Sequence, residues 1–308
     1  MPCYKPITSW ASPDVNPGTG KRPRVWNESE GLDNSRMELA CGRCIGCRMD
    51  KAQEWAIRIM HERQQHDLCC FLTFTYNNHF LPSPPSLDKE HFRLFMKRLR
   101  ADHKYRNPDS PPIKYFMCGE YGGQTRRPHY HAIIFGLNFT DKRLHKKSGS
   151  GSLLYTSAKL DELWGLGHCY IGNVTYASAG YVARYCLKKV NGEMADDHYR
   201  YVNTQTGETA VLAKEYLGVS KGLGKTHFEK HLTQMYRHDH VVINGHEAPI
   251  PKYYDRQLGK IDPDLLEEIK FQRQERARKN AANNTDERLA VREEIKKAQV
   301  VQLRRDLE

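Results

Sequence analysis

The segment from Cys69 to Lys189 constrains the fold most strongly, because short apolar runs alternate there with helical patterns. The runs are rich in β-branched and aromatic residues, whereas the helical patterns repeat apolar residues every three or four positions. Their order, β-α-β-β-α-β plus one helix, predicts an α+β domain of the ferredoxin-like split βαβ type around a central antiparallel sheet, in which the first and third strands are central. The predicted elements are strands at 69–76, 113–120 and 129–136, helices from Ser86 and Ser157, a strand from His168 and a helix that ends at Lys189.

Composition divides the rest of the chain into three further segments. Residues 1–40 are rich in Pro, Gly, Ser and Asn and predict an extended or partly disordered arm. A helix is expected from Arg48, and a hairpin near Thr204. The tail mixes both charges at helical spacing, which predicts a solvated helix and leaves partner binding or self-association open. The predicted segments are 1–47 (arm with a cysteine cluster), 48–190 (core), 191–261 (basic loop and hairpin extension) and 262–308 (charged helical tail).

The charge balance indicates an anionic partner such as nucleic acid. Lys and Arg number 48 against 37 Asp and Glu, which gives a net charge of +11 and a pI near 9.1. The sequence has no apolar stretch of membrane-spanning length and no apolar signal core, so we expect a cytosolic protein without membrane contact. In a reducing compartment the nine cysteines are thiols or metal ligands rather than disulfides.

Two histidines share one face of the strand at 129–136. His129 and His131 stand two positions apart, so their side chains point the same way while Tyr130 points to the other face. In the simplest alternative to metal binding, the two histidines are polar residues that face solvent on an edge strand. Glu120 ends the neighbouring strand before the loop and is expected opposite or diagonal to His129. Two imidazoles and one carboxylate leave open positions on a divalent cation, with Mn²⁺ or Mg²⁺ as the expected ion.

A pair of tyrosines follows on the last helix of the core. Tyr181 and Tyr185 are four residues apart and share a helix face, and Lys188 follows three positions later. Aromatic residues at this spacing often form a core stripe. Next to a metal site they are also candidate covalent nucleophiles for phosphorus. In the loop before the histidines, Arg126 and Arg127 can hold phosphates of a bound strand, although arginines in loops are often only solvated.

These motifs carry a family resemblance. In order and spacing, FLTFTY, GEYGGQTRRPHYHAIIFG and GYVARYCLKK resemble the three motifs of the HUH endonucleases, the rolling-circle replication initiators. The tyrosine pair is similar to that in initiators of small icosahedral single-stranded DNA phages. The stretch CGRCIGCR and the Pro-rich N-terminus look closest to initiators of the gokushovirus branch of the microviruses.

The resemblance implies a role for each motif residue. His129 and His131 match the HUH metal ligands, Glu120 the third ligand, and Tyr181 and Tyr185 the paired nucleophiles. Lys188 occupies the place of a catalytic lysine, a role for which Lys189 competes, and Lys189 is also a candidate DNA-binding residue. The implied activity is nicking of single-stranded viral origin DNA, with a 5′-phosphotyrosyl link and a 3′-OH that host polymerase extends. Rejoining then releases circular genomes, in the cytoplasm of an infected bacterium and with host helicase as a further partner.

Two other interpretations remain beside this one. GVSKGLGKTHF is similar to a phosphate-binding P-loop, but its glycines enclose five residues instead of four. Lys221 and Lys225 are therefore interpreted as part of a loop that approaches the DNA backbone. The second alternative is a non-catalytic nucleic-acid-binding protein organised by zinc. Its candidate zinc ligands are Cys41, Cys44 and Cys47, with Cys3 as a candidate fourth ligand. If they bind no zinc, these residues are reduced cysteines around a helix start.

Overall fold

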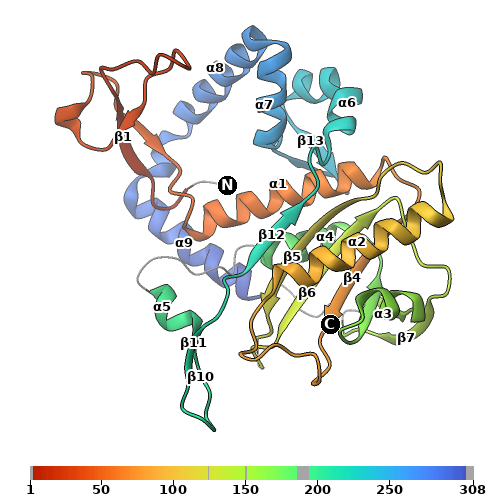
Figure 1. The fold of residues 1–308 in the computed structure, drawn as a ribbon. Coiled ribbons are helices and arrows are strands. Elements are labelled where there is room, and N and C mark those ends of the chain that lie inside the picture. Colours follow the sequence, from red (N-terminus) through yellow and green to blue (C-terminus); the bar gives the residue numbers. More distant parts are fainter. Residues whose placement is uncertain (1–2, 124, 150, 186–193, 303–308) are drawn as a thin grey trace. The chain divides into compact units, whose positions relative to one another are not determined.

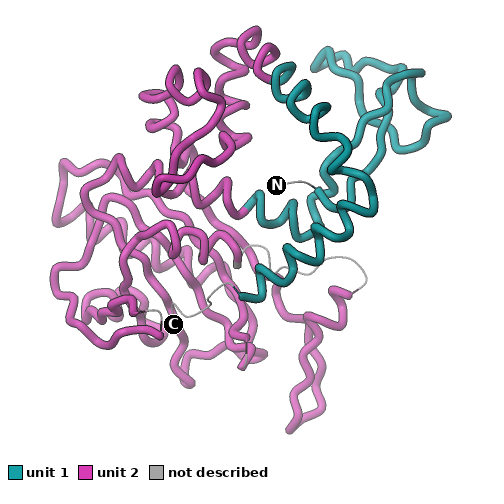
Figure 2. The backbone as a smooth tube through the Cα atoms, turned by 180° about the vertical axis from the view of Figure 1, so that it is seen from behind, with its two compact units in different colours: residues 1–51, 270–303 teal, residues 52–269, 304–308 magenta. Residues whose placement is uncertain are grey.

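The computed structural model describes residues 3–123, 125–149, 151–185 and 194–302 (Figure 1). The chain forms two compact units (Figure 2). Unit 1 combines residues 1–51 with 270–303, and unit 2 comprises 52–269 together with 304–308. The four segments predicted from composition stay a prediction. None of the helices in the described residues is long and apolar enough to cross a membrane.

A seven-stranded antiparallel sheet forms the centre of unit 2. The strand order is β12-β5-β6-β4-β9-β8-β7, so β4 and β6 lie in the interior. This agrees with the predicted α+β class and its antiparallel sheet. The strands are β4 (Cys69–Thr75), β5 (Lys114–Tyr121), β6 (Pro128–Phe135), β7 (Arg143–Lys147), β8 (Leu153–Thr156), β9 (Cys169–Gly172) and β12 (Tyr216–Val219).

Helices cover both faces of this sheet. Strand β6 is buried along its whole length, and its alternating side chains supply both layers. Tyr130 and Ile134 join an apolar cluster with α2 (Lys89–Arg106) and α3 (Ala158–Trp164), of which α2 crosses the front of the sheet in Figure 1. Ile133 and Phe135 pack on the opposite face, which we call the site face, against α1 (Ile45–Arg63) and α4 (Tyr176–Tyr185).

The rest of unit 2 is more structured than its composition indicates. The predicted hairpin near Thr204 is confirmed, whereas the strand β12 and most of the helical structure that follows were not predicted. Phe228 and Tyr254 centre a third apolar cluster, which includes Ile57 of α1. The additional elements are α5 (Met194–Tyr199), β10 (Arg200–Val202), β11 (Thr209–Val211), α6 (Lys225–His238), β13 (Val241–Ile243), β14 (His246–Ala248), α7 (Lys252–Ile261) and the start of α8 (Pro263–Lys279).

Unit 1 contains more regular structure than the predicted extended or partly disordered arm. Its strands β1 (Ile7–Ala11), β2 (Arg24–Val25) and β3 (Met37–Leu39) form an antiparallel sheet of order β2-β1-β3. These strands are too short to show an apolar period, and pairing of their backbone groups, which composition does not reveal, orders them. The helical tail is confirmed by α8 and by α9 (Asp286–Val301).

Two boundaries inside the core also differ from the prediction. The strand predicted to run from His168 to Tyr176 ends at Gly172, and α4, which was predicted to start at Ala179, begins at Tyr176. Thr175 and Ser178 cause this early start, because each side-chain oxygen accepts a hydrogen bond from the other residue's backbone N–H, at 3.1 and 2.8 Å. The hairpin of β7 and β8 was not predicted, since the five residues of β7 are all exposed and show no apolar alternation.

A buried carboxylate links three parts of unit 2. Glu62 of α1 accepts hydrogen bonds from Lys114 (2.8 Å), His66 (2.8 Å) and the backbone N–H of Gly224 (2.7 Å). Burial would raise the pKa of Glu62, but these hydrogen bonds outweigh it and lower the pKa to about 2. We expect Glu62→Gln to lower the free energy of unfolding by about 3 kcal/mol at pH 7, because it leaves the partners imperfectly paired. Urea denaturation measures this difference.

The pH dependence provides a second readout of the same substitution. The folded-state pKa of about 2 lies below the ordinary value of 4.5, so the ionised carboxylate contributes fully above about pH 4.5. Its contribution is lost as the pH falls toward 2, and the difference between wild type and variant should shrink over that window. Glu162→Gln is the control, because its ion pair with Lys159 is exposed and is expected to contribute less than about 0.5 kcal/mol. Equal effects of the two substitutions would contradict the prediction.

Candidate functional site

The hairpin of β5 and β6 gathers three potential metal ligands at one end of the site face. Its register pairs Glu120 with His129 and Cys118 with His131. Because side chains alternate along a strand, both histidines and Glu120 point to the site face. Glu120 and His131 are 0% and 1% exposed, and His129 is also buried. Glu120 therefore lies directly across from His129, which is one of the two positions expected from the sequence.

The ligand atoms converge on one point. The Nε2 atoms of His129 and His131 lie 2.9 and 3.0 Å from the same oxygen, Oε1 of Glu120. Burial would raise the pKa of Glu120, but the hydrogen bonds and charges of the two imidazoles lower it to about 2. The carboxylate is consequently ionised at neutral pH. One ligand atom from each of the three residues lies within 4.8 Å of the others.

This donor set fits a divalent cation. An octahedral ion with bonds of about 2.1 Å separates neighbouring ligand atoms by about 3 Å, which matches the two observed distances. Each imidazole also has a contact at its other nitrogen. The Nδ1–H of His129 donates to the carbonyl oxygen of Arg127 at 3.2 Å, and Nδ1 of His131 lies 3.0 Å from Oγ1 of Thr73. Such contacts fix ring orientation and direct Nε2 toward a cation.

Tyr181 packs directly against this group. Its ring lies edge-on to the imidazole of His131, with 5.3 Å between the ring centroids and 86° between the planes. The side chain is 2% exposed and belongs to the apolar cluster between α4 and the sheet. Tyr181 thus occupies a core position and at the same time lies beside a candidate metal ligand. Tyr185 ends α4, and its side chain, like Lys188 and Lys189, lies outside the described residues.

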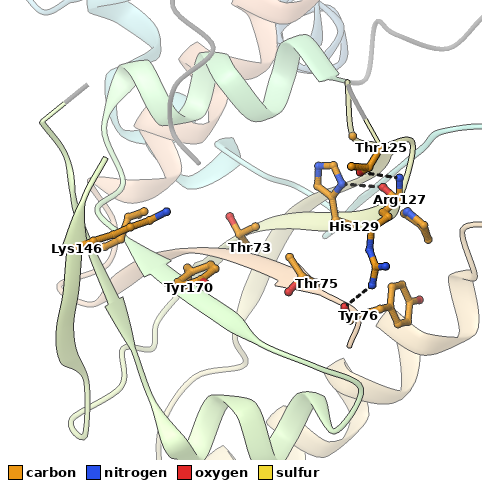
Figure 3. A pocket seen from close by; sticks show the side chains of 11 residues that line it. Thr73, Thr75, Tyr76, Thr125, Arg127, His129, Lys146 and Tyr170 are labelled. Atoms are coloured by element: carbon orange, nitrogen blue, oxygen red, sulfur yellow. Dashed lines mark hydrogen bonds between the residues drawn. The ribbon is translucent and has the colours of Figure 1, made fainter. Parts of the chain in front are cut away.

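An open pocket of about 250 Å³ lies beside His129 (Figure 3). Arg127 is fixed at the pocket by two hydrogen bonds, to Oδ1 of Asn78 at 2.9 Å and to the carbonyl oxygen of Tyr76 at 3.0 Å. Arg126 instead donates to the carbonyl oxygen of His198 at 2.6 Å. The pocket is lined by Thr73, Thr75, Tyr76, Gly122, Thr125, Arg127, Pro128, His129, Lys146, Leu154 and Tyr170.

Three residues of this region were not identified from the sequence. Thr73 and Tyr170 are paired across β4 and β9, and Lys146 lies on β7 with its ammonium group 5.8 Å from the ring centroid of Tyr170. The signal for Thr73 is its polar side chain at an alternate position, shared with Thr75, in a strand whose other residues are apolar. No such sequence signal identifies Lys146, because β7 shows no alternation of apolar and polar residues.

The region of Lys221 and Lys225 differs from the predicted loop. Lys221 is exposed in the turn after β12, but Lys225 is the first residue of α6 and forms an ion pair with Glu229 at 3.0 Å. The backbone N–H of Gly224, at the start of α6, donates to the Glu62 carboxylate. A carboxylate therefore lies where a P-loop would hold a phosphate, which argues against nucleotide binding at this turn.

The four candidate zinc ligands meet in unit 1. Cys3, Cys41, Cys44 and Cys47 each place a sulfur atom within 4.8 Å of the other three. We call this group the cysteine cluster. It includes Cys3, whose participation the sequence leaves open.

Comparison with known proteins identifies the family of this chain. Residues 69–190 match the family described as replication-associated protein ORF2/G2P. The chain is 36% identical over 228 residues to replication-associated protein VP4 of Bdellovibrio phage phiMH2K, covering 73% of this chain and 68% of that protein. The chain belongs to this family of replication-associated proteins.

Two further relatives support the assignment. Replication-associated protein ORF2 of Spiroplasma virus 4 is 31% identical over 254 residues, which covers 78% of this chain and 74% of the relative. Replication-associated protein ORF4 of Chlamydia phage 1 is 30% identical over 229 residues, with 72% and 54% covered. No solved structure matches the chain. The resemblance to replication proteins of microviruses is therefore confirmed.

Proposed function

We propose that this protein initiates replication by nicking single-stranded viral origin DNA with a tyrosine. The observation that carries the proposal is the contact of the Tyr181 ring with His131, beside Glu120 and His129. A candidate nucleophile on α4 thus packs against the sheet face that carries three candidate metal ligands. The relatives, named as replication-associated proteins of phages, support a role in viral DNA replication.

The sheet supports the HUH interpretation of the fold. Its core strands occur in the order β9-β4-β6-β5, with the first and third core strands, β4 and β6, inside. This is the order of a ferredoxin-like split βαβ domain. The strands β7, β8 and β12 extend that core on both sides.

Glu120, His129 and His131 would hold Mg²⁺ or Mn²⁺, which when bound polarises a non-bridging oxygen of the scissile phosphate. Thr73 and the carbonyl oxygen of Arg127 keep the two imidazoles in orientation. The ionised Glu120 supplies the negative charge of the donor set. A rigid sheet is well suited to this task, because a nicking reaction needs fixed positions for the phosphate and the nucleophile.

In the proposed reaction, the phenol oxygen of Tyr181 or Tyr185 forms a bond to phosphorus and the bond from phosphorus to O3′ breaks. The phenol releases its proton to solvent, and O3′ takes up a proton and leaves as a 3′-OH. The DNA 5′ end remains attached as a phosphotyrosine, so the phosphodiester bond is exchanged and not hydrolysed. Lys188, with Lys189 as the alternative, is the candidate catalytic lysine.

The pocket beside His129 is the proposed entry for the DNA strand. Lys146 offers a cation for a phosphate, and Tyr170 offers a ring on which a base can stack. Arg127 contributes charge at the same place. The chain's net charge of +11 supports binding to the viral strand, with the helicase and polymerase of the infected bacterium as the proposed partners in its cytoplasm.

A covalent-capture assay tests the proposal. We expect the purified protein to form a protease-sensitive adduct with one member of a tiled set of single-stranded oligonucleotides from the viral genome. The adduct should appear with Mn²⁺ or Mg²⁺ and disappear with EDTA, and the matching duplexes should yield none. DNA binding without any adduct, in either metal, would instead favour a non-catalytic protein organised by zinc.

A further inference from the structure

The sulfur atoms of the cysteine cluster have the spacing of a metal tetrathiolate. Sγ of Cys3 lies 3.9 Å from Sγ of Cys44, and Sγ of Cys41 lies 4.0 Å from Sγ of Cys47. A tetrahedral zinc site with Zn–S bonds of about 2.3 Å separates its sulfur atoms by about 3.8 Å. A disulfide would need about 2.05 Å, and all eight cysteines in the described residues are free thiols.

Backbone amide groups around the cluster favour the charged thiolate form. The N–H groups of Cys41 and Tyr4 donate to the sulfurs of Cys3 and Cys44, at 3.2 and 3.3 Å. The sulfur of Cys41 accepts from Cys44 at 3.3 Å and from Arg43 at 3.4 Å. Hydrogen bonds to a thiolate stabilise its negative charge and orient it as a ligand.

The chain path around the cluster also suits a metal-binding turn. Gly42 has a φ of +71°, a left-handed conformation that other residues adopt only with strain, and it directs the chain from Cys41 back to Cys44. Helix α1 begins directly after Cys44, and Cys47 lies in its first turn. The helix N-terminus adds a positive electrostatic potential that favours thiolates.

Unit 1 buries few apolar side chains in the residues that the structure describes. In the part of unit 1 that the structure describes, the buried apolar residues are Tyr4, Cys44 and Leu289 of α9, and they pack around the cluster itself. Small units with so few buried apolar side chains need a disulfide or a metal ion for stability. The cluster is therefore both the centre of unit 1 and the place where a metal would stabilise it most.

We propose that Cys3, Cys41, Cys44 and Cys47 bind one structural Zn²⁺, and that this ion maintains the fold of unit 1. Four sulfur ligands at tetrahedral spacing close the coordination sphere, so this zinc has a structural role and no open position for substrate. The proposal is independent of the nicking reaction, which uses a different donor set in unit 2.

Metal analysis of the full-length protein tests the ligand assignment. We expect about one zinc per chain after dialysis without chelator, because structural zinc binds tightly at pH 7. Cys3→Ser and Cys44→Ser should each lower the zinc content severalfold, whereas Cys69→Ser, a thiol outside the cluster, should not. The double substitution His129→Ala and His131→Ala should also retain the zinc. The proposal would be overturned by wild-type protein that contains no zinc or contains iron instead. It would also be overturned by a Cys44→Ser variant that retains its full zinc content.

Hydrogen exchange on the wild-type protein tests the structural role without any substitution. After a chelator has removed the zinc, the amides of β1, β2 and β3 should exchange at least about tenfold faster, because unit 1 loses its fold. The amides of β4 and β6 in unit 2 should change less than about twofold. Unchanged protection in unit 1 after verified zinc loss would overturn the structural role.

Discussion

Replacing His129 and His131 together by alanine is expected to abolish formation of the covalent DNA adduct while DNA binding persists. The two imidazoles and Glu120 form the candidate metal site, and a metal that stabilises charge on the phosphate contributes several kcal/mol. A loss of about 4 kcal/mol corresponds to roughly 1,000-fold in rate. Binding depends mainly on phosphate contacts of Lys and Arg, so its affinity should change little and should still fall steeply with salt. Gel analysis of adducts and fluorescence anisotropy measure the two quantities.

The control must separate lost chemistry from lost folding. Removing both imidazoles leaves the Glu120 carboxylate buried without two of its hydrogen-bond donors, which destabilises the sheet. The double variant is therefore compared with Glu120→Gln, because the amide keeps the size of the side chain and has no charge. His246→Ala, a substitution at an exposed position of β14, is the neutral control. Adducts at the wild-type rate in a folded double variant would refute the role of the histidines.

Local sequence patterns predicted the arrangement of the candidate site. The two-residue period of a strand puts His129 and His131 on one face, and the short loop between the strands brings Glu120 opposite His129. Helical spacing likewise predicted the helix that carries Tyr181. These predictions succeed because each rests on residues close together in the sequence, where backbone geometry alone determines which side chains share a face.

Contacts between distant segments could not be predicted in this way. Cys3 meets Cys41 across 38 positions, and Tyr170 meets Thr73 across the pairing of β4 with β9. Such contacts depend on the complete fold, and the residues involved have no distinctive local pattern. Strand β12 was missed for a related reason, because it is a four-residue partly buried strand that β5 stabilises through backbone pairing.

The second prediction with a large effect concerns the two tyrosines of α4. Tyr181→Phe and Tyr185→Phe are each expected to retain some initial nicking, whereas the double substitution should form no adduct. The positions are one helical turn apart, about 6 Å along the axis, so a modest shift of α4 can bring either phenol to the phosphate. Phenylalanine keeps the edge-on ring contact of Tyr181 with His131 and removes only the hydroxyl.

The burial of Tyr181 makes this comparison informative. Its side chain is 2% exposed, so its phenol reaches DNA only if α4 moves away from the sheet. Tyr176→Phe is the matched control, because it removes a hydroxyl from the same helix at a partly buried position. That variant should form adducts at the wild-type rate. A similar loss in all three single variants would point to a disturbed helix instead of a lost nucleophile.

Release of unit-length circles distinguishes a pair of nucleophiles from a single one. After the first cut one tyrosine holds the displaced 5′ end, so the cut that follows a full round of synthesis requires a second phenol. The new 3′-OH then attacks the first phosphotyrosine, which closes the circle and frees that tyrosine. Each single variant should therefore nick but fail to release circles. Peptide mapping of the adduct decides the assignment: DNA attached to neither tyrosine would refute it, and circle release after loss of one would leave a one-tyrosine enzyme.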